Sequence, residues 1–303
     1  MTPFTRPPRL KPGATIGIAA ISGPVDEKPL ASGIRALEGR GYTIVPASNI
    51  GERAGFFAGS DERRAAGYRE LLRDPRVDAI FFARGGYGAS RILPLLSADE
   101  IRSRPRIHLG GSDLTVLFAF LATHARLVSF YGPMVAVGLA EEGLDWEGVL
   151  AGESPALHCV AEEDVLAGGV GQGPLTGGCL SLAASLAGTS EAMDGRGRVF
   201  FWEDVGEEPY RLDRMLTQLE RSGTFDQLQA MIIGSISPGA RGGGESQPSV
   251  DAWLRDRFAG SPFPVVRGFP AGHLRRCRTL PLGMPVLVDA EHGIVKFAGP
   301  AVA

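Results

Sequence analysis

Short apolar runs alternate with segments of helical spacing over the first part of this chain. The runs at residues 15–21 (TIGIAAI) and 77–83 (VDAIFFA) have the length and composition of buried strands. Between them, residues 29–40 and 61–72 carry apolar side chains at the spacing of amphipathic helices. Another short strand, at residues 107–110, leads into a further helical segment. Strands that alternate with helices usually pair in parallel, so the sequence predicts a doubly wound, mostly parallel sheet covered on both faces.

The pattern changes after about residue 148. Residues 150–178 are rich in glycine, proline and small side chains and show little helical period. Apolar runs then return with fewer helices between them, and strands are predicted near residues 199–202, 230–236, 265 and 286–288. We therefore expect an α/β domain over residues 1–150, a linker over 151–175 and a smaller β-rich, barrel-like domain over 176–303.

Composition excludes several classes of protein. The chain has 303 residues and a net charge of −3, and it has no run of lysine or arginine, which argues against a nucleic-acid partner. No apolar stretch approaches the roughly 18 residues of a membrane span, and residues 1–11 lack the apolar core of a secretory signal. Cys159, Cys179 and Cys277 form no CxxC pair, so neither a zinc site nor a redox motif is indicated. We expect a cytoplasmic protein without metal or cofactor.

The first segment that can carry chemistry is residues 107–120 (IHLGGSDLTVLFAF). A strand ends in two glycines, Ser112 follows, and a helix begins directly afterwards. Such a sharp strand-to-helix turn lifts a serine hydroxyl above the sheet edge and directs the following N–H groups to the same space. The spacing is not G-x-S-x-G, because Leu114 stands at the last position. The alternative is that Ser112 or Asp113 only caps the helix.

The second segment is the glycine loop at residues 81–93 (FFARGGYGASRIL). Gly86-x-Gly88 begins like a dinucleotide-binding motif, but Arg91 stands where the third glycine would be. The loop could therefore bind a phosphate, supply N–H groups to an oxyanion, or be only a tight turn with glycines at positive φ.

Two further segments supply an acid and a base. Glu203 follows an apolar strand, where a carboxylate can orient a histidine, although the nearby Glu207 and Glu208 also fit a solvated acidic loop. His273 lies in a loop between Gly272 and an arginine pair. The other four histidines lack such a context, and His108 is expected to be buried. No H-E-x-x-H spacing exists, so the sequence predicts no zinc site.

The order Ser112, Glu203, His273 and the sequence around each residue closely resemble the LD-carboxypeptidase family, which includes muramoyltetrapeptide carboxypeptidases and microcin C immunity peptidases. The matching stretches are residues 58–63 (AGSDER), 84–88 (RGGYG), 111–115 (GSDLT), 132–134 (GPM), 203–207 (EDVGE), 210–216 (YRLDRML), 268–273 (GFPAGH) and 279–283 (TLPLG).

The resemblance implies a two-domain fold in which an α/β domain carries the serine and a β-rich domain carries the glutamate and the histidine. Ser112 would be the nucleophile, His273 the general base and Glu203 the residue that orients it. The N–H groups of Gly86 and Asp113 would form the oxyanion hole. The resemblance also implies a homodimer. Cys179 and Cys277 depart from the family, where asparagine is common at both positions.

The resemblance further implies a substrate: a murein tetrapeptide, cut before its terminal D-alanine during cell-wall recycling. Arg84 is a candidate for binding the free carboxylate, or else an ion-pair partner within the protein. Hydrolysis of a peptidyl-nucleotide antibiotic is an alternative within the enzyme class. A nucleotide-binding oxidoreductase and a catalytically inactive muropeptide-binding protein are the alternatives outside it.

Overall fold

A computed structural model describes residues 3–237 and 249–303 of the chain. By contacts between its residues, the chain divides into two compact units. Unit 1 comprises residues 1–154, 275–283 and 299–303, and unit 2 comprises residues 155–274 and 284–298. The domain boundaries expected from the sequence stay a prediction, since contacts alone do not show which parts fold independently.

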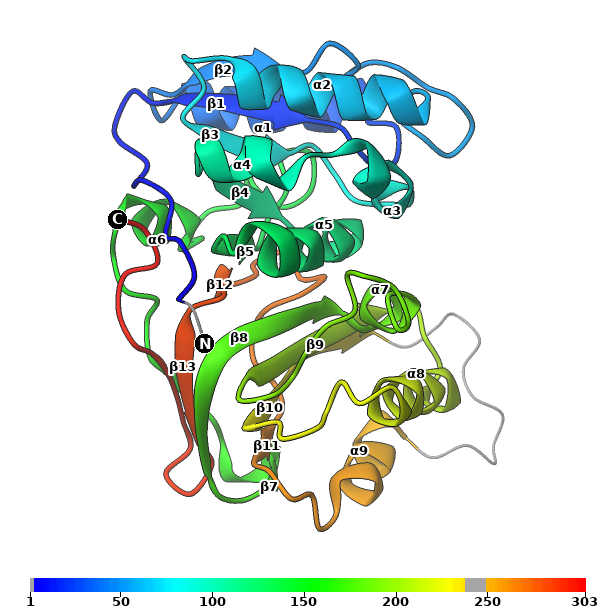
Figure 1. The fold of residues 1–303 in the computed structure, drawn as a ribbon. Coiled ribbons are helices and arrows are strands. Elements are labelled where there is room, and N and C mark those ends of the chain that lie inside the picture. Colours follow the sequence, from blue (N-terminus) through cyan, green and yellow to red (C-terminus); the bar gives the residue numbers. More distant parts are fainter. Residues whose placement is uncertain (1–2, 238–248) are drawn as a thin grey trace. The chain divides into compact units, whose positions relative to one another are not determined.

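The centre of unit 1 is a six-stranded sheet in the order β12-β5-β4-β3-β1-β2 (Figure 1). All neighbours pair in parallel except β12, which runs antiparallel to β5. The mostly parallel sheet predicted for this part of the chain is therefore confirmed. The strands are β1 (Thr15–Ala19), β2 (Thr43–Pro46), β3 (Ala79–Phe82), β4 (Ile107–Gly110), β5 (Ser129–Tyr131) and β12 (Leu280–Leu282).

Helices lie on both faces of this sheet. Because the chain moves from β1 to β2 in one direction and from β2 through β5 in the other, right-handed connections place α1 on one face and α2, α4 and α5 on the opposite face (Figure 1). The helices are α1 (Glu27–Glu38), α2 (Asp61–Arg73), α3 (Ala89–Ile92), α4 (Ala98–Ser103), α5 (Thr115–Phe120) and α6 (Trp146–Ala151), with short 3-10 turns η1 (Leu93–Leu95) and η2 (Ser112–Leu114) and a π-helical segment η3 (Leu121–Ala125) after α5.

The core of unit 1 explains why its strands are almost wholly apolar. Both faces of the sheet are covered, so its inward side chains are fully buried: the exposed fraction is 0% for Ile16, Phe81, Phe82 and Leu109. Each such side chain stabilises the fold by about 1.5–3 kcal/mol relative to an exposed one. The sheet also determines where a ligand can bind: its strand order reverses between β1 and β3, and in open α/β sheets ligands bind at that switch point, outside the carboxyl ends of the strands.

Unit 2 contains an eight-stranded mixed sheet in the order β6-β14-β13-β8-β9-β10-β11-β7. Strands β8 to β11 pair in parallel, and the strands outside them pair antiparallel. This is the mixed, curled sheet expected as a barrel-like part of the fold. The strands are β6 (His158–Cys159), β7 (Val165–Ala167), β8 (Val170–Cys179), β9 (Val199–Val205), β10 (Ala230–Ser237), β11 (Val265–Val266), β13 (Pro285–Asp289) and β14 (Ile294–Phe297).

The helices of unit 2 are α7 (Leu180–Ser185), α8 (Pro209–Arg221) and α9 (Val250–Phe258), with a short turn η4 (Glu162–Asp164). Its longest strand, β8, contains four glycines, which weaken a strand interior unless close packing requires them. Gly177 shows the requirement: its φ is 120°, and a Cβ there would lie 1.8 Å from the carbonyl oxygen of Phe201 on β9. Within the described residues, no helix is long and apolar enough to cross a membrane.

Candidate active site

Ser112 lies at the carboxyl end of β4 in a strained turn. Its φ is 59°, in the left-handed region that a residue with a side chain enters only at a cost of about 1–3 kcal/mol. The Ser112 N–H donates to the hydroxyl of Tyr131 at 2.9 Å, and the hydroxyl of Thr115 donates to the Ser112 carbonyl at 2.7 Å. These two bonds hold the turn from both sides. The sharp strand-to-helix turn expected at Ser112 is therefore present, and its backbone is strained.

The structure decides against the helix-cap alternative for Ser112. The 3-10 turn that begins at Ser112 has Gly111 as its N-cap, and no side chain caps it. The α-helix that follows likewise starts without a side-chain cap. The partly exposed Ser112 hydroxyl is thus not used to terminate the helix.

The glycine loop after β3 packs directly against this turn. A Cβ built on Gly85 would lie 2.7 Å from the Ser112 Cβ, 2.9 Å from its Oγ and 3.2 Å from the Asp113 nitrogen. The Gly85 carbonyl accepts a hydrogen bond from the N–H of Gly23, in the loop after β1, at 3.2 Å. The loops that follow β1, β3 and β4 therefore converge at the switch point of the sheet. In the sequence, the doubled glycine is the one local signal for the contact between Gly85 and Ser112.

This contact leads to a prediction for Gly85→Ala. The new methyl group would overlap the nucleophile and displace it, and a displacement of about 1 Å typically costs on the order of 100-fold in rate. We expect kcat/KM to fall by about that factor while the protein still folds. Gly51→Ala is the matched control, because a Cβ at Gly51 meets no atom within 4 Å. Equal activities of the two variants would contradict the assigned contact.

Asp113 joins the serine turn to the glycine loop. Its side chain is 0% exposed, and its Oδ2 accepts the N–H of Ala89, the first residue of α3, at 2.8 Å. Burial raises the pKa of this carboxyl, which the hydrogen bond from Ala89 partly offsets. The backbone N–H of Asp113 belongs to the first turn of a helix, where N–H groups have no acceptor within the helix. An N–H in this position can stabilise a developing negative charge.

Arg84 precedes the glycine loop and is partly buried. Its Nη1 donates to the carbonyl of Pro24 at 3.3 Å, and its buried Nε has no acceptor. In residues 3–237 and 249–303, no carboxylate lies within 4 Å of its guanidinium group. The structure therefore does not support an ion pair between Arg84 and another residue of the protein. The guanidinium group of Arg84 remains a candidate for binding an anionic ligand.

Glu203 and His273 form a close pair within unit 2. The Glu203 side chain is 0% exposed at the end of β9, so it does not belong to a solvated acidic loop. Its Oε2 lies 2.7 Å from Nδ1 of His273 and also accepts the backbone N–H of His273 at 3.0 Å. The contact expected between this acid and this histidine is therefore present. Nε2 is the ring nitrogen that remains for a reacting group.

Glycine at position 272 allows the loop that carries His273 to approach Glu203 closely. Gly272 has a φ of 116°, and a Cβ there would lie 2.5 Å from Glu203 Oε2 and from the Ser235 hydroxyl. The loop is held to β10 by a hydrogen bond from the Ser235 N–H to the Ala271 carbonyl at 2.9 Å. Only a glycine fits between the loop, the strand and the carboxylate.

The charges around the Glu203–His273 pair favour the protonated form of the His273 ring. Burial disfavours a charge on His273, but the hydrogen bond and charge of Glu203 and the charge of Asp204 outweigh it, so the pKa of His273 is raised above its ordinary value. Asp204 is itself 2% exposed, and burial raises the pKa of its carboxyl, although it accepts the Ser181 N–H at 2.8 Å.

The two cysteines that depart from the family pattern are buried, and neither is part of a disulfide among the described residues. Burial, with the charges of Asp204 and Glu203 adding to it, raises the pKa of the Cys179 thiol. The Sγ of Cys179 lies 3.3 Å from the Ser181 hydroxyl and 3.7 Å from Asp204 Oδ2, beside the glutamate strand. Cys179 therefore lies near the Glu203–His273 pair without belonging to it. Among the residues that the structure describes, no group of three or more His, Cys, Asp or Glu side chains could hold a metal ion.

Comparisons with known proteins agree in both halves of the chain. Residues 16–132 match the LD-carboxypeptidase N-terminal domain, and residues 172–288 match the LD-carboxypeptidase C-terminal domain. A candidate carboxypeptidase of Streptomyces coelicolor is 38% identical over 100% of this chain and 99% of its own length. A probable murein peptide carboxypeptidase of Bacillus subtilis is 32% identical over 97% of this chain and 95% of its own.

Solved structures match the fold as well. The structure of MccF in complex with glutamyl sulfamoyl guanosine superposes with a TM-score of 0.88 at 22% identity, covering 98% of this chain and 99% of the other. At that identity the likeness concerns the fold, and it confirms the predicted combination of an N-terminal α/β part with a C-terminal mixed sheet.

Proposed function

The chain belongs to the LD-carboxypeptidase family of serine peptidases, and from that premise we propose that it releases the terminal D-alanine of murein tetrapeptides. The observation that carries the proposal is the Glu203–His273 pair, whose buried carboxylate orients one ring nitrogen and leaves the other for a nucleophile. The Bacillus subtilis relative, named for murein peptides, supports the substrate class. The proposal includes a homodimer that recycles cell-wall fragments in the cytoplasm.

In the proposed mechanism, Nε2 of His273 takes the proton of the Ser112 hydroxyl while Oγ attacks the scissile carbonyl carbon. The N–H groups of Gly86 and Asp113 stabilise the oxyanion, a contribution of about 3–4 kcal/mol for each donor. The tetrahedral intermediate then expels the D-alanine amine, which receives the proton from His273. Water attacks the ester carbon with His273 again as the base, and Ser112 is regenerated.

Glu203 and Arg84 have supporting roles in this proposal. Glu203 fixes the tautomer of His273 and stabilises the imidazolium that forms at each proton transfer. Arg84 binds the free carboxylate of the terminal D-alanine, because a planar guanidinium matches a carboxylate in a bidentate arrangement. A carboxypeptidase needs such a group to distinguish the end of a peptide from its interior.

The substrate prediction can be tested with a pair of murein tetrapeptides that differ only in the last residue. We expect rapid release of D-alanine from the peptide that ends in D-alanine, and release slower by at least about 100-fold from its L-alanine counterpart, since a misplaced amide loses alignment with the nucleophile. Chiral chromatography of the released amino acid measures both rates. Equal or faster release of L-alanine would contradict the proposed L-D specificity.

A second candidate, hydrolysis of a peptidyl-nucleotide antibiotic, is suggested by the likeness to MccF. The same assay with an aminoacyl sulfamoyl nucleoside tests it. The oxidoreductase alternative is wrong, because the chain belongs to a hydrolase family and its glycine loop packs against Ser112. An inactive binding protein is not supported either, because the chain belongs to a peptidase family and the proposed catalytic residues are all present.

A further inference from the structure

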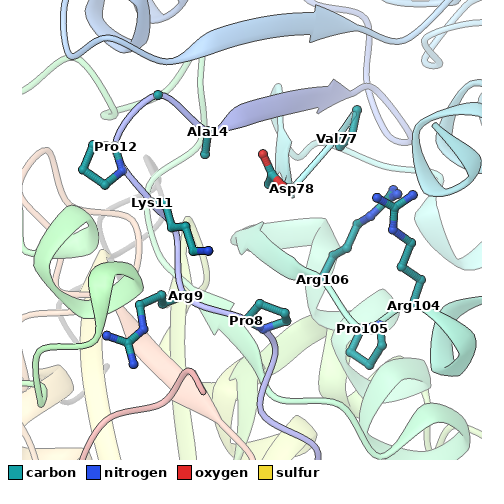
Figure 2. A pocket seen from close by; sticks show the side chains of 11 residues that line it. Pro8, Arg9, Lys11, Pro12, Ala14, Val77, Asp78, Arg104, Pro105 and Arg106 are labelled. Carbon is teal, nitrogen blue, oxygen red and sulfur yellow. The ribbon is translucent and has the colours of Figure 1, made fainter. Parts of the chain in front are cut away.

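Unit 1 has a cavity at the opposite end of its sheet from Ser112. Its volume is about 420 Å³, and its lining includes the residues just before three parallel strands: Ala14 before β1, Asp78 before β3 and Arg106 before β4 (Figure 2). The proposed site residues of unit 1 follow the carboxyl ends of β3 and β4. Nothing in the proposed peptidase mechanism uses the amino ends.

Positive charge predominates around this cavity. Arg9, Lys11, Arg104 and Arg106 line it, and Asp78 is the one carboxylate among its lining residues. The Oδ2 of Asp78 accepts the N–H of Thr15 at 2.9 Å, and the Asp78 charge offsets part of the charge of Arg106. The chain as a whole carries a net charge of −3, so this concentration of cations is local.

Among the described residues, these cations differ from the many arginines that form ion pairs with carboxylates. Nearby, Arg73 pairs with Glu100 at 2.5 Å, and Arg76 pairs with Asp74 at 2.7 Å. By contrast, in the part of the chain that the structure describes, no carboxylate lies within 4 Å of the charged groups of the four lining cations. Asp74 and Asp78 offset part of the charge of Arg106, but only through longer-range attraction.

Arg104 and Arg106 are held next to each other by the end of α2. Nη1 of Arg104 and Nη2 of Arg106 both donate to the Asp74 carbonyl oxygen, at 3.1 Å and 2.6 Å. These bonds fix the positions of the guanidinium groups, but a carbonyl oxygen carries no net charge to neutralise them. Arg106 is 2% exposed, and its buried Nε has no acceptor. Burial, reinforced by the charge of Arg104, lowers the pKa of Arg106 to about 10.

We propose that this cavity is a binding site for a small phosphate-bearing anion, separate from the peptidase site. Two adjacent guanidinium groups offer planar forks for phosphate oxygens, and Lys11, which extends toward the centre of the cavity in Figure 2, adds a compact point charge. A single carboxylate would balance only part of this charge. The excess of cations and the volume of the cavity match a diphosphate or phosphomonoester group.

Calorimetric titration of the full chain with inorganic pyrophosphate, at constant ionic strength, tests the proposal. We expect saturable binding that weakens by about tenfold or more in Lys11→Glu and in Arg104→Glu, because each variant replaces an attraction with a repulsion. Both side chains are exposed, so neither change disturbs the core. Lys28→Glu, on the exposed surface of α1, is the matched control and should bind within about twofold of the original chain.

Three outcomes would overturn the proposal. They are the absence of saturable binding, an equal loss of affinity in Lys28→Glu and Lys11→Glu, and tighter binding of citrate than of pyrophosphate. The first two would show that the cations act only as a diffuse surface charge, and the third would assign the cavity to carboxylates. Because the readout is binding, failure here leaves the proposed peptidase activity untouched.

Discussion

Ser112→Ala should eliminate the release of D-alanine from a murein tetrapeptide, with kcat lower by on the order of 10⁶-fold. Removing the nucleophile of a serine peptidase leaves only the contributions of the oxyanion hole and of substrate binding. The hydrogen bonds that position residue 112 use its backbone N–H and carbonyl, so alanine should occupy the same turn. Time courses of amino-acid release measure the effect, and circular dichroism verifies the fold.

Ser112→Gly gives this prediction a second readout. Glycine adopts a φ of 59° without the strain that serine meets there, so the melting temperature should rise although activity is lost. Ser185→Ala, on the exposed surface of α7, is the control and should leave both quantities unchanged. Substantial activity in Ser112→Ala, or a lower melting temperature in Ser112→Gly, would contradict the assignment of a strained nucleophile.

Features of the fold that depend only on residues adjacent in the sequence could be predicted. The strand at residues 107–110 coincides with β4, and the turn at Ser112 follows from two glycines between a strand and a helix. The helix expected over residues 61–72 corresponds to α2, which begins at Asp61, and the Ser60 hydroxyl caps it by accepting the N–H of Arg63 at 3.3 Å. Serine is among the residues preferred at a helix N-cap, so this start is a local feature of the sequence.

Features that depend on residues far apart in the chain could not be predicted from the local pattern. Strand β12 completes the sheet of unit 1 by pairing with β5, although about 150 residues separate them. Strand β8 lacks the β-branched composition of a typical strand, since its glycines allow close approach to neighbouring backbone. The hydrogen bond from the Ser112 N–H to the Tyr131 hydroxyl could not be predicted either, because nothing near Tyr131 in the sequence indicates a partner on another strand.

Glu203→Gln should lower kcat by about 10⁴-fold while the protein folds normally. An amide has nearly the same shape but can present its N–H₂ to Nδ1 of His273, which favours the wrong tautomer of the ring. The variant also removes the charge that, against the effect of burial, helps to raise the pKa of His273. Because a general base must be neutral to accept a proton, activity falls as pH decreases through this pKa. The acidic limb of the kcat/KM profile should therefore move to lower pH in the variant.

The control for this prediction is Glu207→Gln, which makes the same chemical change four residues along the chain. Glu207 pairs with Arg211 on a partly exposed surface at 3.5 Å, and such pairs contribute about 0–1 kcal/mol, so neither the rate nor the pH profile should change. A merely structural role for Glu203 would lower stability or the amount of active enzyme, but it would leave the acidic limb in place. A large loss of rate without a shift of that limb would therefore show that Glu203 supports the loop around His273 and does not tune its ring.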